Sequence, residues 1–158
     1  MAKKATAKDA EIIMQLYDLR REPEMRKARH WWLTQFWPND SDDFMKIAMG
    51  LGSQENNWLR QVGGYWSMAA AFVESGALNA DLFLQPAVSG EMFFIFAKVH
   101  PLLTELREKL GDPHFMLNIE KVISKTKFGR DRLQFVLKRV NQAKERRAAS
   151  RAASSTAS

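Results

Sequence analysis

The sequence contains no cysteine among its 158 residues. This absence rules out disulfides, thiolate metal ligands and cysteine nucleophiles, and it is typical of proteins from a reducing compartment. Long apolar runs are missing too, since the longest, 92–97, is far shorter than the roughly 20 residues that cross a bilayer. The opening MAKKATAKDAEII lacks the apolar stretch of a secretory signal. We therefore expect a soluble, cytoplasmic protein.

Residues that carry chemistry are also scarce. The three histidines, His30, His100 and His114, lack the second histidine or Glu-x-x-His pair that metal sites in helical bundles use. The segment 50–55, GLGSQE, lacks the third glycine and the Lys-Ser/Thr pair of a phosphate loop. The acidic cluster in 39–43 lacks the bidentate glutamate of an EF-hand. We therefore predict no metal, no cofactor and no catalytic residue, and a protein that is not an enzyme.

Helical periodicity runs through almost the whole chain, without an internal repeat or a pair of strand candidates. It predicts an all-α fold, a compact bundle of six or seven helices with a basic C-terminal helix and a flexible tail. Prolines, glycines and capping residues set the boundaries. Helices are expected at about 8–21, 23–37, 40–50, 53–75, 79–85, 89–111 with a kink at Pro101, 113–124, and from 130 onward.

These boundaries also predict the domain organisation. Residues 1–7 form a flexible N-terminus and residues 8–124 the helical domain. Residues 125–147 form the basic C-terminal helix. The low-complexity Ala/Ser tail, 148–158, is expected to be disordered, because it has little apolar surface to bury.

Aromatic residues are abundant, with ten Phe and five Trp. Three of the tryptophans fall in the segment 25–38, MRKARHWWLTQFWP. On a helical wheel Trp32 lies in an apolar stripe, Trp31 and Trp37 lie at its edges, and the cations lie opposite. We interpret the segment as a helix that packs into the core. A surface platform of aromatic and cationic side chains that binds a ligand is the alternative.

The expected helix 53–75 carries an aromatic stripe on one side and small residues on the other. Gly63 and Gly64 each cost this helix roughly 1 kcal/mol relative to alanine, so a close contact should compensate. We expect a central helix that neighbouring helices touch on both sides. The alternative is self-association, with Gly63, Gly64, Ser67 and Ala71 as the contact residues.

Charge is distributed unevenly along the chain. Residues 1–120 contain 13 Lys/Arg and 16 Asp/Glu, a net −3, whereas residues 121–158 contain 11 and 2, a net +9. Cations on the basic C-terminal helix can bind nucleic-acid phosphates, anionic lipid or an acidic protein. The pattern indicates no surface aromatics between these cations, as a nucleic-acid-binding surface would have. Equally, they can be solvated and stabilise the helix's own negative end. The predicted anion-contact residues are Lys125, Lys127, Arg130, Arg132, Lys138, Arg139, Lys144, Arg146 and Arg147.

Two segments carry a family resemblance. LYDLRREPEMRKARHWW at 16–32 and WSMAAAFVESGALNADLF at 66–83 resemble a bacterial family of small helical proteins of unknown function. A "pe-x-R-x-AR" helix and a helix ending in "aa-x-fv-x-x-Gal" recur in that family, and the likeness covers about residues 10–110. The resemblance implies a helical fold but no activity and no site residues. Family members often follow a membrane anchor, and no such segment is visible in this sequence.

Three functional hypotheses follow from these observations. The first is a non-enzymatic interaction module that binds a protein partner or a second copy of the chain. The second is binding of nucleic acid, or of another anionic surface, through 121–151. The third is an enzyme or small-molecule carrier with a pocket among Trp32, Trp58, Trp66 and Phe94.

Overall fold

The computed structural model describes residues 3–156, which form helices and the turns between them, with no strand in this range. None of the described helices is both long enough and apolar enough to cross a membrane. The helical elements are α1 (Ala7–Leu19), α2 (Pro23–His30), the π-helical turn η1 (Trp31–Gln35), α3 (Ser41–Ala48), α4 (Gln54–Glu74), α5 (Ala80–Phe83), α6 (Pro86–Val99), the 3-10 turn η2 (His100–Leu102), α7 (Leu103–Leu110), α8 (Leu117–Lys125) and α9 (Lys127–Thr156).

The all-α prediction is confirmed: the described residues form a bundle of eight helices followed by the long α9. The sequence predicted six or seven helices in the bundle, and the structure has eight. The additional helix arises because the kink expected at Pro101 is a full break. Proline lacks the backbone N–H that would continue the helix, and the 3-10 turn η2 therefore separates α6 from α7.

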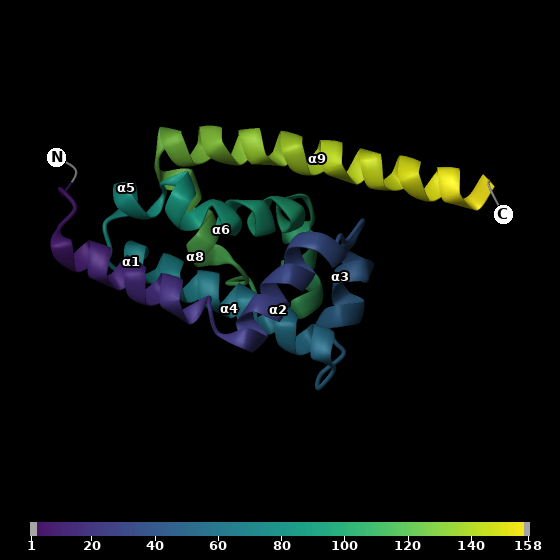
Figure 1. The fold of residues 1–158 in the computed structure, drawn as a ribbon, viewed down its shortest axis with the longest axis horizontal. Helices are drawn as coiled ribbons and strands as arrows, with labels where there is room; N and C mark the ends of the chain where they lie inside the picture. Colours follow the sequence, from purple (N-terminus) through teal and green to yellow (C-terminus); the bar gives the residue numbers. More distant parts are fainter. Residues whose placement is uncertain (1–2, 157–158) are drawn as a thin grey trace.

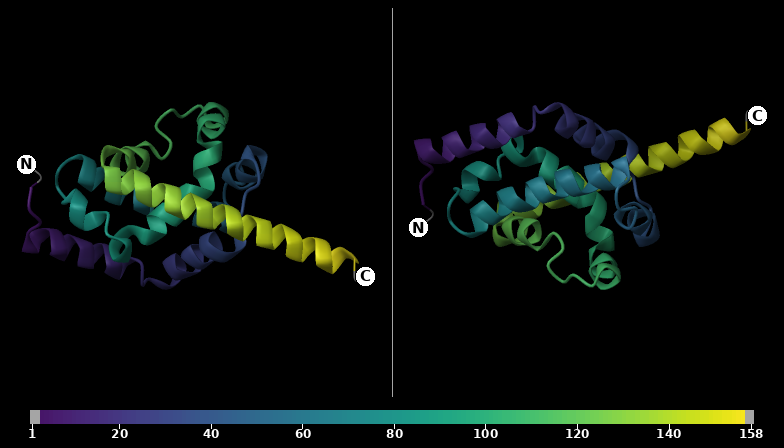
Figure 2. Two further views of the ribbon diagram at one scale, coloured as in Figure 1. Left: turned by 90° about the horizontal axis from the view of Figure 1, so that it is seen from above. Right: turned by 90° about the horizontal axis from the view of Figure 1, so that it is seen from below.

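Helix α4 lies at the centre of the bundle and packs against α2 and α8. Helix α9 packs along α6 and α8 and lies across one face of the molecule (Figure 1). Its C-terminal end extends past α3 and overhangs the body in every view (Figures 1 and 2). The start of α1 and the end of α9 are at opposite ends of the molecule.

Helix starts follow the predicted capping residues. Ser53 accepts the backbone N–H of Asn56 at 3.1 Å and begins α4, and Asn79 caps α5 in the same way. Pro23 occupies the first turn of α2, as expected. Gly76 ends α4 in the left-handed conformation with a φ of 77°, which costs glycine little because it has no Cβ.

Two predicted helix starts are wrong. Asp112 and Pro113 do not begin a helix, because the Asp112 carboxylate accepts the backbone N–H of His114 at 2.9 Å and closes a turn instead. Helix α8 begins only at Leu117. Helix α9 begins at Lys127 rather than at residue 130, because the Thr126 hydroxyl accepts the backbone N–H of Gly129 at 2.9 Å and thereby caps an earlier turn.

The tail also differs from the prediction. Residues 148–156 continue α9 instead of being disordered, and residues 157–158 lie outside the described part of the chain. Alanine has the highest helix propensity of all residues, so an alanine-rich segment that follows a packed helix can continue it without burying apolar surface. At the other end, residues 3–6 precede α1, whose cap is Thr6.

The aromatic residues form the core. Trp32 and Trp66 are 0% and 1% exposed, and Trp31 stacks on Phe36 with ring centroids 4.5 Å apart. Trp37 is half-buried at the edge of this cluster. The interpretation of the tryptophan-rich segment as part of the core is therefore confirmed.

A charged pair inside this core joins three helices. Arg29 of α2 donates from Nε to Oε2 of Glu91 on α6 at 2.8 Å, while Trp66 of α4 donates from Nε1 to Oε1 of the same carboxylate at 3.1 Å. The Glu91 side chain is only 8% exposed. Buried carboxylates are stable when hydrogen-bonded to a cation in this way. Glu91 therefore connects α2 to α4 at the centre of the bundle.

Replacing Glu91→Gln should destabilise the fold by about 1–2 kcal/mol, because the guanidinium of Arg29, which is 27% exposed, would lose a counter-charge that solvent screens only in part. Urea denaturation followed by circular dichroism measures the change. Glu11→Gln is the control, because Glu11 makes only an exposed pair with Lys8 and its loss should leave the free energy of unfolding nearly unchanged. Equal stability of the two variants would contradict a structural role for the Arg29–Glu91 pair.

Candidate functional site

A groove of about 520 Å³ opens between α3, the first half of α4 and the segment 110–116. We call it the glycine groove, because Gly63 and Gly64 of α4 line it. Apolar side chains, among them Phe44, Leu59 and Phe115, supply most of its lining. Its volume lies within the range of about 300–1,000 Å³ that is usual for ligand pockets.

Within the described residues 3–156, no other segment covers the floor of the glycine groove at Gly63 and Gly64. A Cβ built on Gly63 or on Gly64 would have no neighbouring atom within 4 Å. The expected close contact with a neighbouring helix of the same chain is therefore wrong at these two positions, although Ala70, farther along α4, is fully buried. Of the predicted contact residues, Gly63, Gly64 and Ser67 line the groove and Ala71 does not.

Two buried polar atoms belong to side chains that line this groove. Trp32 Nε1 and Asn56 Oδ1 have no hydrogen-bond partner in the described part of the chain, and both residues are 0% exposed. The amide nitrogen of Asn56 is in use, because it donates to the carbonyls of Ile47 and Ala48 at 3.0 and 2.9 Å. An unpaired buried donor and an unpaired buried acceptor each cost roughly 1–3 kcal/mol, so a polar group that reaches them from the groove would be stabilised.

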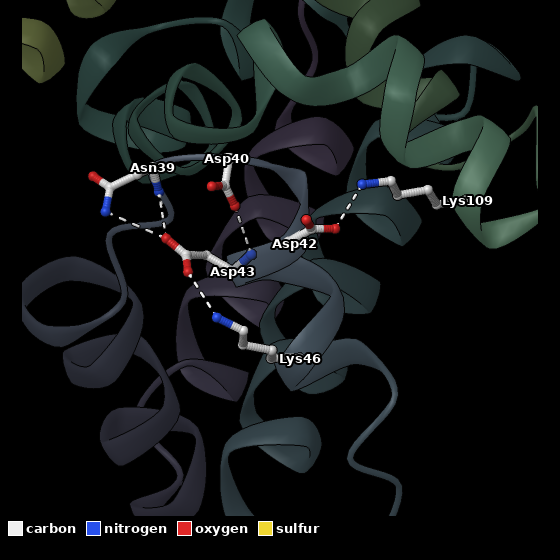
Figure 3. A network of polar contacts seen from close by, with 6 residues as sticks. All are labelled: Asn39, Asp40, Asp42, Asp43, Lys46 and Lys109. Carbon is white, nitrogen blue, oxygen red and sulfur yellow. Dashed lines mark hydrogen bonds and ion pairs between the residues drawn. The ribbon is translucent and has the colours of Figure 1, made fainter.

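A network of charges and caps holds the α3 wall of the groove in place (Figure 3). Asp40 accepts the backbone N–H of Asp43 at 2.8 Å and begins α3, as the acidic cluster predicted. Lys109 of α7 donates to Asp42 at 2.7 Å (Figure 3), and this hydrogen bond lowers the pKa of the Asp42 carboxyl. The network therefore fastens α7 to the start of α3, and its acidic residues serve a structural role.

The opposite wall of the groove is the segment between α7 and α8. Met116 there has a φ of 54°, in the left-handed region that non-glycine residues rarely adopt. Arg107 donates from Nε to the carbonyl of Phe115 at 3.1 Å and holds the turn. Arg60, Asp112 and His114 are exposed at the rim, so the groove combines an apolar floor with a polar edge, as protein-binding surfaces do.

A second unusual region lies at the C-terminal end of η1. Lys98 of α6 is 0% exposed and donates from Nζ to the carbonyls of Trp32 and of Phe36, the latter at 2.8 Å. The same nitrogen lies 3.8 Å from the centre of the Trp37 ring, a favourable cation–π distance. Lys98 thus satisfies carbonyls that the turn leaves without intrahelical partners.

Two cations of α9 bind the same end of η1. Lys144 donates to the carbonyl of Pro38 at 3.0 Å and Arg147 to that of Thr34 at 3.3 Å. Burial, together with the charges of Arg147 and Lys144, lowers the pKa of Lys98 to about 7. Burial also lowers the pKa of Lys144. Lys144 and Arg147 thus fix α9 to the body, and Lys98 is closed off from solvent.

The predicted anion-contact residues of the C-terminal segment divide into two groups. Residues of the first group make ion pairs or hydrogen bonds within the chain. Lys125 pairs with Glu74 at 3.0 Å, and Lys127 pairs with Asp131 at 2.5 Å. Arg130 donates to the carbonyl of Ser124 at 2.6 Å. Lys144 and Arg147 also belong to this group.

The second group lies on the outer side of α9. Arg132 and Arg139 lie over the ring of Phe135, 5.1 and 5.7 Å from its centroid, and Lys138 and Arg146 are exposed. Phe128 and Phe135 are 47% and 49% exposed. Surface aromatics are thus interleaved with these cations, contrary to the expectation from the sequence.

The expected pocket of aromatic residues is not formed. Trp32 lines the glycine groove, whereas Trp58 lines a shallow hollow beside Trp31. Trp66 is buried against Glu91, and Phe94 packs edge-on against Trp37. Among residues 3–156, no group of three or more His, Cys, Asp and Glu side chains is placed to hold a metal ion.

Several site residues escaped the sequence analysis. Asn56 lies in the first turn of α4, where polar residues are ordinary, and only the geometry reveals its unpaired oxygen. Lys98 did leave a signal, because it is the only charge in the buried stretch 92–99. The wall at 110–116 could not be found, because that segment was expected to be partly helical.

Comparison with known proteins gives a family for most of the chain. The model of a family described as a domain of unknown function, DUF4760, matches residues 5–126. The match contains the whole glycine groove and Lys98, and it ends just before α9. No curated protein and no solved structure matches the chain.

Lys98 predicts a pH-dependent stability. Between pH 7 and 10 the unfolded chain, with an ordinary lysine pKa of 10.5, keeps a proton that the folded protein has released from Lys98. Stability rises with pH wherever the unfolded state binds more protons. The free energy of unfolding should therefore increase over this interval by a few kcal/mol at most, about 1.4 kcal/mol for each pH unit.

Replacing Lys98→Met should remove most of this increase, with a remainder from Lys144, whose lowered pKa acts in the same direction. Guanidinium denaturation at pH 7, 8, 9 and 10 measures both proteins, and Lys46→Met, at an exposed lysine, is the matched control. A slope shared by all three proteins would show that Lys98 is not the group that titrates.

Proposed function

The chain belongs to this family, DUF4760, and we propose that it is a non-enzymatic interaction module that self-associates through the glycine groove. We propose the cytoplasm as its compartment, in keeping with a chain that contains no cysteine. The partner in this proposal is a protein surface, with a second copy of the chain as the principal candidate.

The open floor of the groove carries the proposal. Each glycine inside α4 costs roughly 1 kcal/mol relative to alanine, and within the described chain no close contact at Gly63 or Gly64 offsets that cost. Glycines allow another backbone to approach a helix closely. A partner that packs on this face would use the space that a side chain would otherwise fill.

The character of the groove supports a protein partner. Its apolar floor is bordered by the exposed polar residues Arg60, Asp112 and His114, as in the core-and-rim pattern of protein interfaces.

Substituting Gly64→Leu should convert a self-associated protein into a monomer. The leucine would occupy the floor of the groove, and it should also raise the helix stability of α4 by about 1 kcal/mol, because leucine is a better helix former than glycine. Gel filtration with light scattering over a range of protein concentrations measures the mass, and thermal unfolding verifies the fold.

Gln61→Leu is the matched control, because Gln61 is exposed on α4 and does not line the groove. This variant adds the same side chain and should keep the mass of the wild-type protein. A wild-type chain that is monomeric at all concentrations tested would reject self-association.

A second candidate function is binding of an anionic polymer, with single-stranded nucleic acid as the specific case. The observation that favours it is the outer side of α9, where Arg132 and Arg139 flank the exposed ring of Phe135. Proteins that bind single strands combine stacking aromatics with cations in this manner.

For this candidate, Phe135→Ala should weaken binding of a fluorescein-labelled oligothymidylate by about 1–3 kcal/mol, because a base loses its stacking partner. Arg139→Gln should reduce the salt dependence of binding by the equivalent of one phosphate contact. Fluorescence anisotropy at several salt concentrations measures both. Lys8→Gln, on α1, is the control, and an equal loss in that variant would indicate unspecific attraction.

A further inference from the structure

We infer that the element that fills the glycine groove is the overhanging end of α9, residues 148–156, of a second copy of the chain. This inference rests on the proposed self-association and names the segment that carries it. The two copies would exchange their α9 ends, each helix packing on the groove of the other.

The end of α9 extends beyond the body of its own chain and leaves its side chains exposed. Lys144 and Arg147 hold α9 against Pro38 and Thr34, and every residue from 148 to 156 is exposed. At 1.5 Å per residue these nine residues extend the helix by about 13 Å. They pass beyond α3 (Figures 1 and 2), the helix that forms one wall of the groove.

The side chains of this segment match the groove in size. Ala148, Ala149, Ala152 and Ala153 recur with a spacing of about four residues, which places them on one face of the helix. On a helical wheel this face points away from the side of α9 that carries the buried Leu133, Val136 and Val140. Alanines facing glycines allow two helix backbones to pack closely, and neither helix has to rearrange.

Charge and hydrogen bonding are complementary as well. The segment 148–156 carries one charge, Arg151, and Asp112 at the rim of the groove can serve as its counter-charge. Trp32 Nε1 and Asn56 Oδ1 lack partners at the groove. Ser155 of the tail donates to the carbonyl of Ala152 at 2.8 Å, and its oxygen can still accept a hydrogen bond from Trp32 Nε1.

Symmetry favours a closed dimer. The overhang leaves the molecule at the end where α3 lies (Figure 1), and the groove opens beside α3. A two-fold axis near this end would bring each overhang to the other groove, so one rotation satisfies both contacts. Such self-complementary interfaces are the commonest in homo-oligomers.

The full-length chain with Ala149→Gln and Ala152→Gln tests the inference. Glutamine forms helices nearly as well as alanine, so α9 should persist, while the added bulk prevents close packing on the glycines. Analytical ultracentrifugation should show the dimer dissociation constant raised tenfold or more. Ser150→Gln adds the same side chain on another side of α9 and should change the constant less than twofold.

Mixing two variants separates the inference from the function on which it rests. The Gly64→Leu chain has a blocked groove and an intact α9 end, and the Ala149→Gln/Ala152→Gln chain has the reverse. A mixture should form heterodimers through the one remaining intact contact, while each variant alone stays monomeric.

If the wild-type chain dimerises and only Gly64→Leu disrupts it, the groove is the interface but the α9 end is not its occupant, and this inference is overturned. If the wild-type chain is monomeric, the proposed function and the inference both fail.

Discussion

The position of every helix at the α3 end depends on how the carbonyls at the end of η1 are satisfied. The π-helical turn closes with the Phe36 N–H bonded to the Trp31 carbonyl at 2.9 Å, and it leaves the next carbonyls without helical partners. Cations from two other helices supply the missing donors. The carbonyls bound by Lys98, Lys144 or Arg147 are those of Trp32, Thr34, Phe36 and Pro38. Because Lys98 comes from α6 and the other two from α9, this one helix end fixes the bundle and the C-terminal arm together.

A buried cation without a carboxylate is costly unless something replaces the counter-charge. Here the replacement is the negative end of a helix, where the carbonyl dipoles point at the ammonium, together with the ring of Trp37 at 3.8 Å. The remaining cost emerges as the lowered pKa of Lys98. Arg29 in the same core has a real counter-charge in Glu91, and its pKa is raised by that hydrogen bond. The buried Lys98 and the partly buried Arg29 thus show two solutions to the same problem, one by dipoles and one by an ion pair.

The sequence predicted what local chemistry decides. The all-α class, the caps at Ser53 and Asn79 and the burial of Trp32 all follow from propensity, capping and periodicity. It could not predict what distant residues decide. The residues near Gly64 in the sequence do not show whether another helix covers it. At Asp112, a carboxylate that could have capped a helix instead accepts the His114 N–H and closes a turn. The glycines and the basic residues of the candidate site were therefore predicted, while the walls of the groove and the unpaired atoms were not.

Several departures from the usual rules of folding lie at the glycine groove, although buried unpaired atoms also occur at Arg20, Ser89 and Arg132. Elsewhere in the described chain most helix starts are capped and the charged core residue Glu91 is fully engaged. At the groove the central helix carries two uncovered glycines, a donor and an acceptor are buried without partners, and the wall includes the left-handed Met116. Natural sequences keep such local conflicts chiefly where function requires them. The aromatic core makes them tolerable, because it stabilises the same helices from their other side. A partner that covered this surface would pack on the uncovered glycines and could offer hydrogen bonds to the two unpaired atoms, and this combination favours the groove as the binding surface.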